Sequence, residues 1–142
     1  MLFETEQDVN NEKNAMNEFL KKMVNPKVKA FKLPQQSLDF MIYDDKKIIA
    51  FIEIKCFKTA WKKYDNIIVA VRKIKKMKVF NHIAPTYFLV RHSDNIITYQ
   101  NVNKLQGEIK WFSRKNQREG AVNDSEDVMF VPTELWNVLK ID

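Results

Sequence analysis

One segment constrains the fold more than any other: residues 48–56 are apolar except for Glu53 and Lys55. Residues 36–43 form a second segment with strand character, and the polar residues 44–47 separate the two. Two such segments joined by a short polar stretch predict a β-hairpin. A charged group inside a buried strand costs stability unless it is paired or binds a metal. Glu53 and Lys55 therefore either belong to a functional site or lie on the exposed face of an amphipathic strand.

The predicted hairpin also brings a second carboxylate to this place. Side chains alternate across a strand, so Glu53 and Lys55 share one face. A turn centred near Asp45 gives pairs whose residue numbers sum to about 91 or 92, which places Asp39 opposite Ile52 or Glu53. A small register shift or a β-bulge decides between these two partners. In either case the carboxylates of Asp39 and Glu53 come close enough to share a cation.

Two neighbouring carboxylates in an apolar hairpin repel each other. Either the pKa of one of them rises, or the pair binds a hard divalent ion such as Mg²⁺, which prefers oxygen ligands and retains water. A water on such an ion is a nucleophile for phosphodiester hydrolysis, and Lys55 is placed to orient or deprotonate it and to offset developing negative charge. Asp39, Glu53 and Lys55 are thus the expected catalytic group.

Two helices are expected around the hairpin. Residues 4–25 carry apolar side chains at helical spacing, and Glu12 falls on that apolar face. Glu12 is a candidate outer metal ligand or a holder of a metal-bound water; the alternative is an acid near a helix N-terminus that the helix dipole favours. Residues 64–82 predict the second helix, which residues 84–85 (Ala-Pro) terminate.

The other segments complete an α/β order. We expect an edge strand within residues 28–33, strands at 87–91, 96–101, 107–113 and 128–131, a polar loop at 114–126, and a short terminal helix from Pro132 or Thr133. The predicted fold is a mixed α/β sandwich. With 142 residues, we expect one domain over residues 1–142, whose core covers about residues 4–101 and whose residues 102–142 are additions.

Charge is distributed unevenly along the chain. The 24 basic and 18 acidic residues give a net charge of +6, and residues 58–78 hold eight basic residues against the single acid Asp65. Such a stretch suits a polyanion, although it is also typical of the solvated side of a helix. The predicted DNA path follows the lysines of this stretch: Lys58, Lys62, Lys63, Lys73 and Lys76.

Location follows from what the sequence lacks. No apolar run approaches the ~20 residues of a membrane span, and the first residues do not form a basic-then-apolar leader. Cys56 is the single cysteine, so no internal disulfide can form. We therefore expect a cytoplasmic, intracellular protein that does not associate with membranes.

These residues resemble the PD-(D/E)XK nuclease superfamily, and most closely its small phage-type and Holliday-junction-resolvase-like members. The resemblance runs from Glu12 through residues 33–39, the Glu53-Ile54-Lys55 motif and the second predicted helix to residues 87–91. Leu38, not proline, precedes Asp39; the nearest proline is Pro34. The resemblance implies the restriction-endonuclease-like αβββαβ core, a mixed central sheet flanked by helices.

The resemblance also implies roles for individual residues. Asp39, Glu53 and the carbonyl of Ile54 hold Mg²⁺ or Mn²⁺, Lys55 assists the attacking water, and Glu12 orients from the side. Tyr64 and Lys73 match the family's pattern on the next helix. The implied activity is metal-dependent endonucleolytic hydrolysis of DNA, which includes branched DNA, by a phage-type enzyme acting inside a host cell.

Assembly and two further functions stay open. A homodimer is expected if a junction or both strands of a duplex are cut, because one domain carries one site. One alternative is a non-catalytic nucleic-acid-binding protein that keeps the nuclease fold and uses the basic helix. The other is an interaction protein whose acidic segment, residues 119–142, docks another protein.

Overall fold

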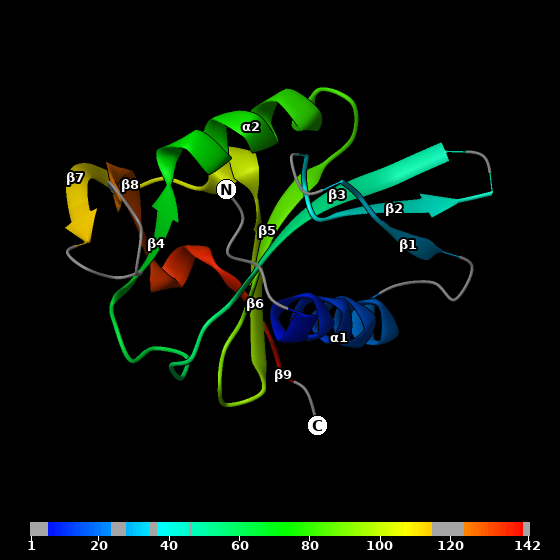
Figure 1. The fold of residues 1–142 in the computed structure, drawn as a ribbon, viewed down its shortest axis with the longest axis horizontal. Coiled ribbons are helices and arrows are strands. Elements are labelled where there is room, and N and C mark those ends of the chain that lie inside the picture. Colours follow the sequence, from blue (N-terminus) through cyan, green and yellow to red (C-terminus); the bar gives the residue numbers. More distant parts are fainter. Residues whose placement is uncertain (1–5, 24–27, 35–36, 46, 115–123, 141–142) are drawn as a thin grey trace.

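Two β-sheets and two α-helices make up the described part of the chain (Figure 1). The computed structural model describes residues 6–23, 28–34, 37–45, 47–114 and 124–140. The elements are α1 (Glu6–Met23), β1 (Lys29–Lys32), β2 (Phe40–Asp44), β3 (Lys47–Cys56), β4 (Asn66–Ala70), α2 (Val71–Asn81), β5 (Thr86–Arg91), β6 (Ile96–Asn101), η1 (Val102–Lys104), β7 (Glu108–Arg114), β8 (Asp124–Pro132), η2 (Thr133–Leu135) and β9 (Asn137–Lys140).

The larger sheet confirms the predicted fold class. Its six strands lie in the order β1-β2-β3-β5-β6-β9, and β3 and β5 are parallel while all other neighbours are antiparallel. Parallel neighbours need a crossover, which β4 and α2 provide here. The sheet is therefore mixed, and β1 is an edge strand as predicted. The predicted hairpin of β2 and β3 is present, and β5 and β6, both predicted as strands, pair with each other.

The two faces of this sheet carry separate hydrophobic clusters, and Figure 1 shows α1 and α2 on opposite sides of it. Met16 and Phe19 of α1 pack on one face with Ile52 and Ile54 of β3. The other face packs against α2, with Phe51 of β3. Because side chains alternate along β3, Glu53 points to the α2 side. This alternation decides which helix can contact the acidic residue.

The predicted helix over residues 64–82 is wrong in its first part. Residues Asn66–Ala70 form strand β4, and α2 covers only Val71–Asn81. Ile67 and Ile74 fit a helical stripe, but Ile67, Ile68 and Val69 are consecutive β-branched residues, which favour a strand. Pairing with β8 buries every second residue of β4 and outweighs the helical pattern. The predicted helix end before residues 84–85 is confirmed.

The C-terminal part of the chain differs more from its predicted secondary structure. The strand expected at residues 128–131 is the longer β8, Asp124–Pro132. Residue 114, in β7, and residues 124–126 of the predicted loop are therefore strand, and residues 115–123 lie outside the described residues. The expected terminal helix is one 3-10 turn, η2, followed by strand β9, which pairs with β6. The predicted strand at residues 107–113 is confirmed as β7. Together β4, β8 and β7 form a second sheet.

Other predicted boundaries shift slightly. The first helix is confirmed as α1, while residues 4, 5, 24 and 25 of the prediction lie outside the described residues. The strand expected from residue 36 begins only at Phe40; residue 36 is not described, and residues 37–39 are not strand. In the described residues, neither helix has the length and hydrophobicity that a membrane crossing requires.

Candidate active site

The hairpin brings Asp39 next to the Glu53-Ile54-Lys55 motif. Phe40 pairs with Ile52, and the same register, extended by one residue, sets Asp39 opposite Glu53. A register shift between Ile42 and Tyr43 accounts for the second predicted register close to the turn. The Ile54 amide donates a 2.8 Å hydrogen bond to Oδ2 of Asp39. This bond fixes the Asp39 carboxylate on β3, between the two charged residues of the motif.

Glu53 is almost completely buried, with 4% of its surface exposed. Nζ of Lys73 on α2 lies 3.3 Å from its Oε2. Burial, and then the neighbouring Asp39, raise the pKa of Glu53, whereas Lys73 and Lys76 lower it by a smaller amount. The predicted proximity of the two acids is thus confirmed. The alternative that Glu53 lies on the exposed face of an amphipathic strand is wrong.

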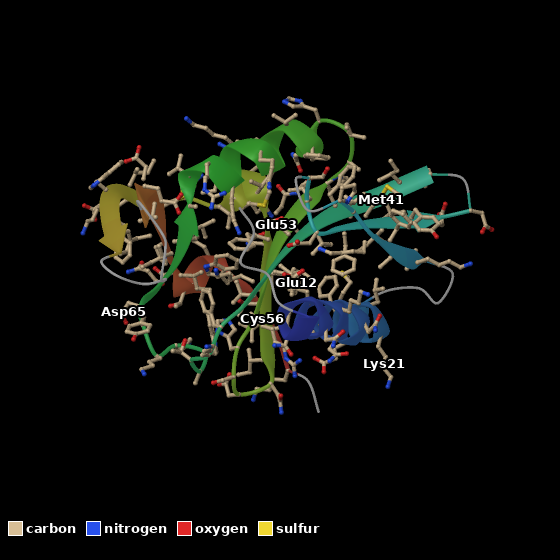
Figure 2. All side chains as sticks on the ribbon, viewed as in Figure 1. Glu12, Lys21, Met41, Glu53, Cys56 and Asp65 are labelled. Atoms are coloured by element: carbon tan, nitrogen blue, oxygen red, sulfur yellow. The ribbon has the colours of Figure 1, made fainter. Side chains whose placement is uncertain are left out.

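Lys55 is exposed on the same side of β3 as Glu53. Ile54, between them, is buried on the α1 side. Figure 2 shows Glu53 on β3 beneath α2, while Glu12 lies on α1 across the sheet. The motif therefore presents a buried residue, Glu53, and an exposed residue, Lys55, on the α2 side.

Lys32, which the sequence does not indicate as a site residue, links Asp39 to Glu12, the third acid of the predicted site. Its Nζ lies 3.3 Å from Oε1 of Glu12 and 3.2 Å from Oδ1 of Asp39, and 5.3 Å from the ring centroid of Phe40. Burial lowers the pKa of Lys32, but Asp39 and Glu12 together raise it more, so the net shift is upward. Strand pairing of Lys32 with Phe40, next to Asp39, is the signal that could have found it.

Glu12 reaches the site through this lysine. It is the seventh residue of α1, which begins at Glu6, so it lies beyond the first turn where the helix dipole acts. The alternative of an N-terminal-turn acid is therefore wrong. Its side chain is 16% exposed and forms the ion pair with Lys32 on the α1 side of the sheet.

The lysines of the predicted DNA path divide into two groups. Lys73 and Lys76 face the site: Lys73 pairs with Glu53, and the Lys76 ammonium donates a 2.9 Å hydrogen bond to the Ser37 carbonyl just before Asp39. The second group is exposed on the segment between β3 and β4: Lys58, Lys62, Lys63 and, beside them, Tyr64. The expected position of Tyr64 on the next helix is therefore wrong, because this residue precedes β4.

That segment is held in place by hydrogen bonds. The Trp61 amide donates to the carboxylate of Asp94 at 3.2 Å and 3.3 Å, and the Ser93 amide donates to the Thr59 carbonyl at 2.9 Å. The β5–β6 turn therefore supports the loop. The backbone of the segment is therefore anchored at Thr59 and Trp61, and it carries the three exposed lysines and Tyr64.

A cavity of about 830 Å³ adjoins the motif. Lys55 and Lys73 line it together with residues of β4, the start of α2 and β8. Arg72, a second residue that the sequence analysis did not assign to the site, lies in its wall and forms a 2.8 Å ion pair with Glu126 of β8. Since β4 was predicted as helix, the sequence could not reveal this cavity.

The acids fit a divalent ion in part. Among the described residues no three His, Cys, Asp or Glu side chains converge as a metal cluster. Asp39 and Glu53 supply two carboxylates, and their repulsion, which raises the pKa of Glu53, is what a divalent cation would relieve. Carboxylate and backbone oxygens are the donors that Mg²⁺ prefers.

Comparison with known proteins identifies the family of the chain and supports its fold. The family described as "Phage putative PDDEXK endonuclease" matches residues 1–139. The structure is similar to that of Hjc, a Holliday junction resolvase from Archaeoglobus fulgidus, with a TM-score of 0.52 and 11% identity over 87% of this chain and 89% of that chain. A search of curated proteins gives no match. The chain belongs to the phage PDDEXK endonuclease family.

Proposed function

We propose that this protein is a divalent-metal-dependent DNA endonuclease that hydrolyses phosphodiester bonds, with branched DNA among its substrates. The observation that carries the proposal is the buried Glu53 beside Asp39, with the exposed Lys55 two residues further on the same side of β3. Family membership supports the endonuclease activity, and the fold shared with Hjc supports the branched substrate.

Asp39, Glu53 and the carbonyl of Ile54 would hold the ion, Mg²⁺ or Mn²⁺. When bound, such an ion supplies a water of lowered pKa and stabilises negative charge on a phosphoryl oxygen. The Ile54 amide already fixes one oxygen of Asp39, and Lys73 contacts one oxygen of Glu53. These contacts orient the two carboxylates. Oε1 of Glu53 is then a potential ligand, whereas Oδ1 of Asp39 would become one when the ion replaces the ammonium group of Lys32 there.

Lys55 is the catalytic lysine of the proposal. Lys55 is an exposed residue in the lining of the cavity, where its ammonium group would contact a phosphate oxygen and orient the attacking water. Glu12 contributes indirectly, since it pairs with Lys32, and Lys32 in turn contacts Asp39. Glu12 and Lys32 are therefore positioning residues in this proposal.

DNA would approach over the segment that carries Lys58, Lys62, Lys63 and Tyr64, where positive charge and an aromatic ring lie together. Lys73 and Lys76 lie closer to the acids. Lys76 donates a hydrogen bond to the carbonyl of Ser37, two residues before Asp39. A homodimer would supply two such sites to a junction or a duplex that is cut on both strands.

The test is a cleavage assay on supercoiled, linear and four-way-junction DNA with Mg²⁺, Mn²⁺ or EDTA. Wild-type protein cleaves with either metal and not with EDTA, whereas Glu53→Gln and Lys55→Ala reduce cleavage by at least about 100-fold, as the loss of a catalytic group does. Lys104→Ala, which removes an exposed lysine of η1, is the matched control and cleaves normally. Equal cleavage by Lys55→Ala and the control contradicts the proposed site.

A second candidate is a non-catalytic nucleic-acid-binding protein with the nuclease fold. The observation in its favour is that lysines already neutralise the acids: Lys32 contacts Glu12 and Asp39, and Lys73 contacts Glu53. It predicts no cleavage with either metal, together with DNA binding whose affinity falls steeply with salt concentration.

A further inference from the structure

The cavity beside Lys55 has a chemistry that the cleavage site itself does not require. Its volume of about 830 Å³ lies within the usual range of small-ligand sites, about 300–1,000 Å³. A ligand of this cavity therefore has the size of one or two nucleotides of a single strand.

The walls of the cavity combine aromatic rings with a few polar groups. Phe57, Phe88 and Phe130 line it, and Tyr64 stands at its edge with 63% of its surface exposed. On the second sheet, Phe130 pairs with Ile68 across β4 and β8, so both side chains lie on the sheet face that lines the cavity. Phe88 is only 2% exposed and packs on Trp136, so the rings that can stack on a nucleobase are Tyr64 and Phe130, the second of which also lies 5.1 Å from Nζ of Lys110.

The charges that line the cavity favour a nucleotide over a free anion as its ligand. Lys55, Lys58, Arg72 and Lys73 supply positive charge, but Asp65 and Glu126 also belong to the lining. A purely anionic ligand meets these two carboxylates, whereas a nucleotide can keep its phosphate at the lysines and insert a neutral base. The Arg72–Glu126 pair is largely exposed and hence weak, so a phosphate can replace Glu126 on Arg72.

We infer that this cavity binds an unpaired nucleobase adjacent to the phosphate that lies at Lys55. This inference rests on the proposed nuclease function and names its substrate class, which is DNA with unpaired nucleotides next to the cleavage position. Lys55 and Lys73 belong both to the cavity and to the candidate active site, so a strand bound at one continues into the other. Fully paired DNA leaves the cavity empty and loses the stacking contribution.

The inference is tested first by binding without cleavage. The probe is a single-stranded hexanucleotide with one 2-aminopurine base, titrated in EDTA with the full-length protein. The wild type quenches the fluorescence of the probe, and Tyr64→Ala weakens binding by about 5- to 150-fold, the range of one stacked base. Tyr64→Phe retains the ring and restores binding, and Phe130→Leu, which keeps the apolar volume, loses most of the quenching.

Trp111→Ala is the matched control, because Trp111 is similarly exposed, at 66%, but lies on the opposite face of the second sheet, outside the cavity. It binds the probe like the wild type. Equal binding by Tyr64→Ala, Phe130→Leu and Trp111→Ala, with melting temperatures that show folded proteins, overturns the inference.

Cleavage then separates this inference from the proposed function. With Mg²⁺, the wild type cuts a duplex that contains a three-nucleotide bulge faster than the same duplex fully paired, and Tyr64→Ala loses that preference. Cleavage of both duplexes at equal rates by the wild type overturns the cavity assignment and leaves the nuclease intact. Selective probe binding without any metal-dependent cleavage overturns the nuclease and supports the cavity.

Discussion

Replacing Lys32 by methionine removes the cation that lies between two acids from different elements. Nζ of Lys32 lies 3.3 Å from Glu12 and 3.2 Å from Asp39, and the three side chains are 16–24% exposed. Hydrogen bonds between charged groups are worth about 1.5–3 kcal/mol when short and buried, and exposed ion pairs less than about 1 kcal/mol. These two contacts are long and partly buried, so we expect Lys32→Met to cost about 2 kcal/mol in total.

For a chain of this length the entropy of unfolding is about 0.3 kcal/mol/K, so 2 kcal/mol corresponds to a decrease of about 7 °C in Tm. Thermal unfolding at pH 7 followed by circular dichroism measures it. Lys29→Met, an exposed position of the same strand, is the control and changes stability by less than about 0.5 kcal/mol. The reasoning is refuted if Lys32→Met and Lys29→Met have the same Tm.

The pH dependence of the same contact has a definite sign. The pKa of Lys32 in the folded protein is raised above 10.5, so the stabilisation is fully present at neutral pH and is lost as pH rises through the folded-state value. The difference between wild type and Lys32→Met therefore stays constant from pH 7 to about pH 9 and decreases at higher pH. A difference that instead grows above pH 10 contradicts the assignment.

Three further predictions concern single residues. Burial and a neighbouring carboxylate raise the pKa of Glu53, so its ionisation opposes folding. Glu53→Gln is therefore more stable than the wild type at pH 8, by on the order of 1 kcal/mol. Urea unfolding at pH 4 and pH 8 measures this difference, which is lost at the lower pH. Lys76→Met removes the contact with Ser37 and reduces metal-dependent cleavage at least about tenfold with a smaller loss of stability, which kinetics and thermal unfolding measure together. Gly107→Ala places a Cβ 1.9 Å from the Phe130 carbonyl oxygen and lowers stability by about 1–3 kcal/mol or more in denaturant unfolding.

Local sequence patterns were sufficient to predict the centre of the fold. The hairpin of β2 and β3 follows from two apolar segments around a polar turn, and its register follows from the length of that turn. Spacing therefore predicts correctly that Asp39 lies near Glu53 and that Lys55 lies on the same side of β3 as Glu53. Both predicted registers occur, because the bulge at Ile42 and Tyr43 separates them.

Features that depend on long-range pairing were not predictable in the same way. Strand β4 has helical spacing with the following residues, and only its pairing with β8, more than 50 residues later, makes it a strand. The sequence predicts a helix for the terminal segment, but this segment forms strand β9, because it pairs with β6. Lys32 was missed since its contacts come from two other elements, α1 and the residue before β2.

The central claim is that Asp39, Glu53 and the Ile54 carbonyl hold one divalent ion beside Lys55. Anomalous diffraction from crystals soaked in Mn²⁺ tests it most directly, with crystals of Glu53→Gln as the comparison. The account predicts an anomalous peak within about 2.5 Å of oxygens of all three residues in the wild type, and a weaker peak or none in the variant. A Mn²⁺ ion bound only elsewhere, in crystals of a protein that cleaves DNA with Mn²⁺, would contradict it.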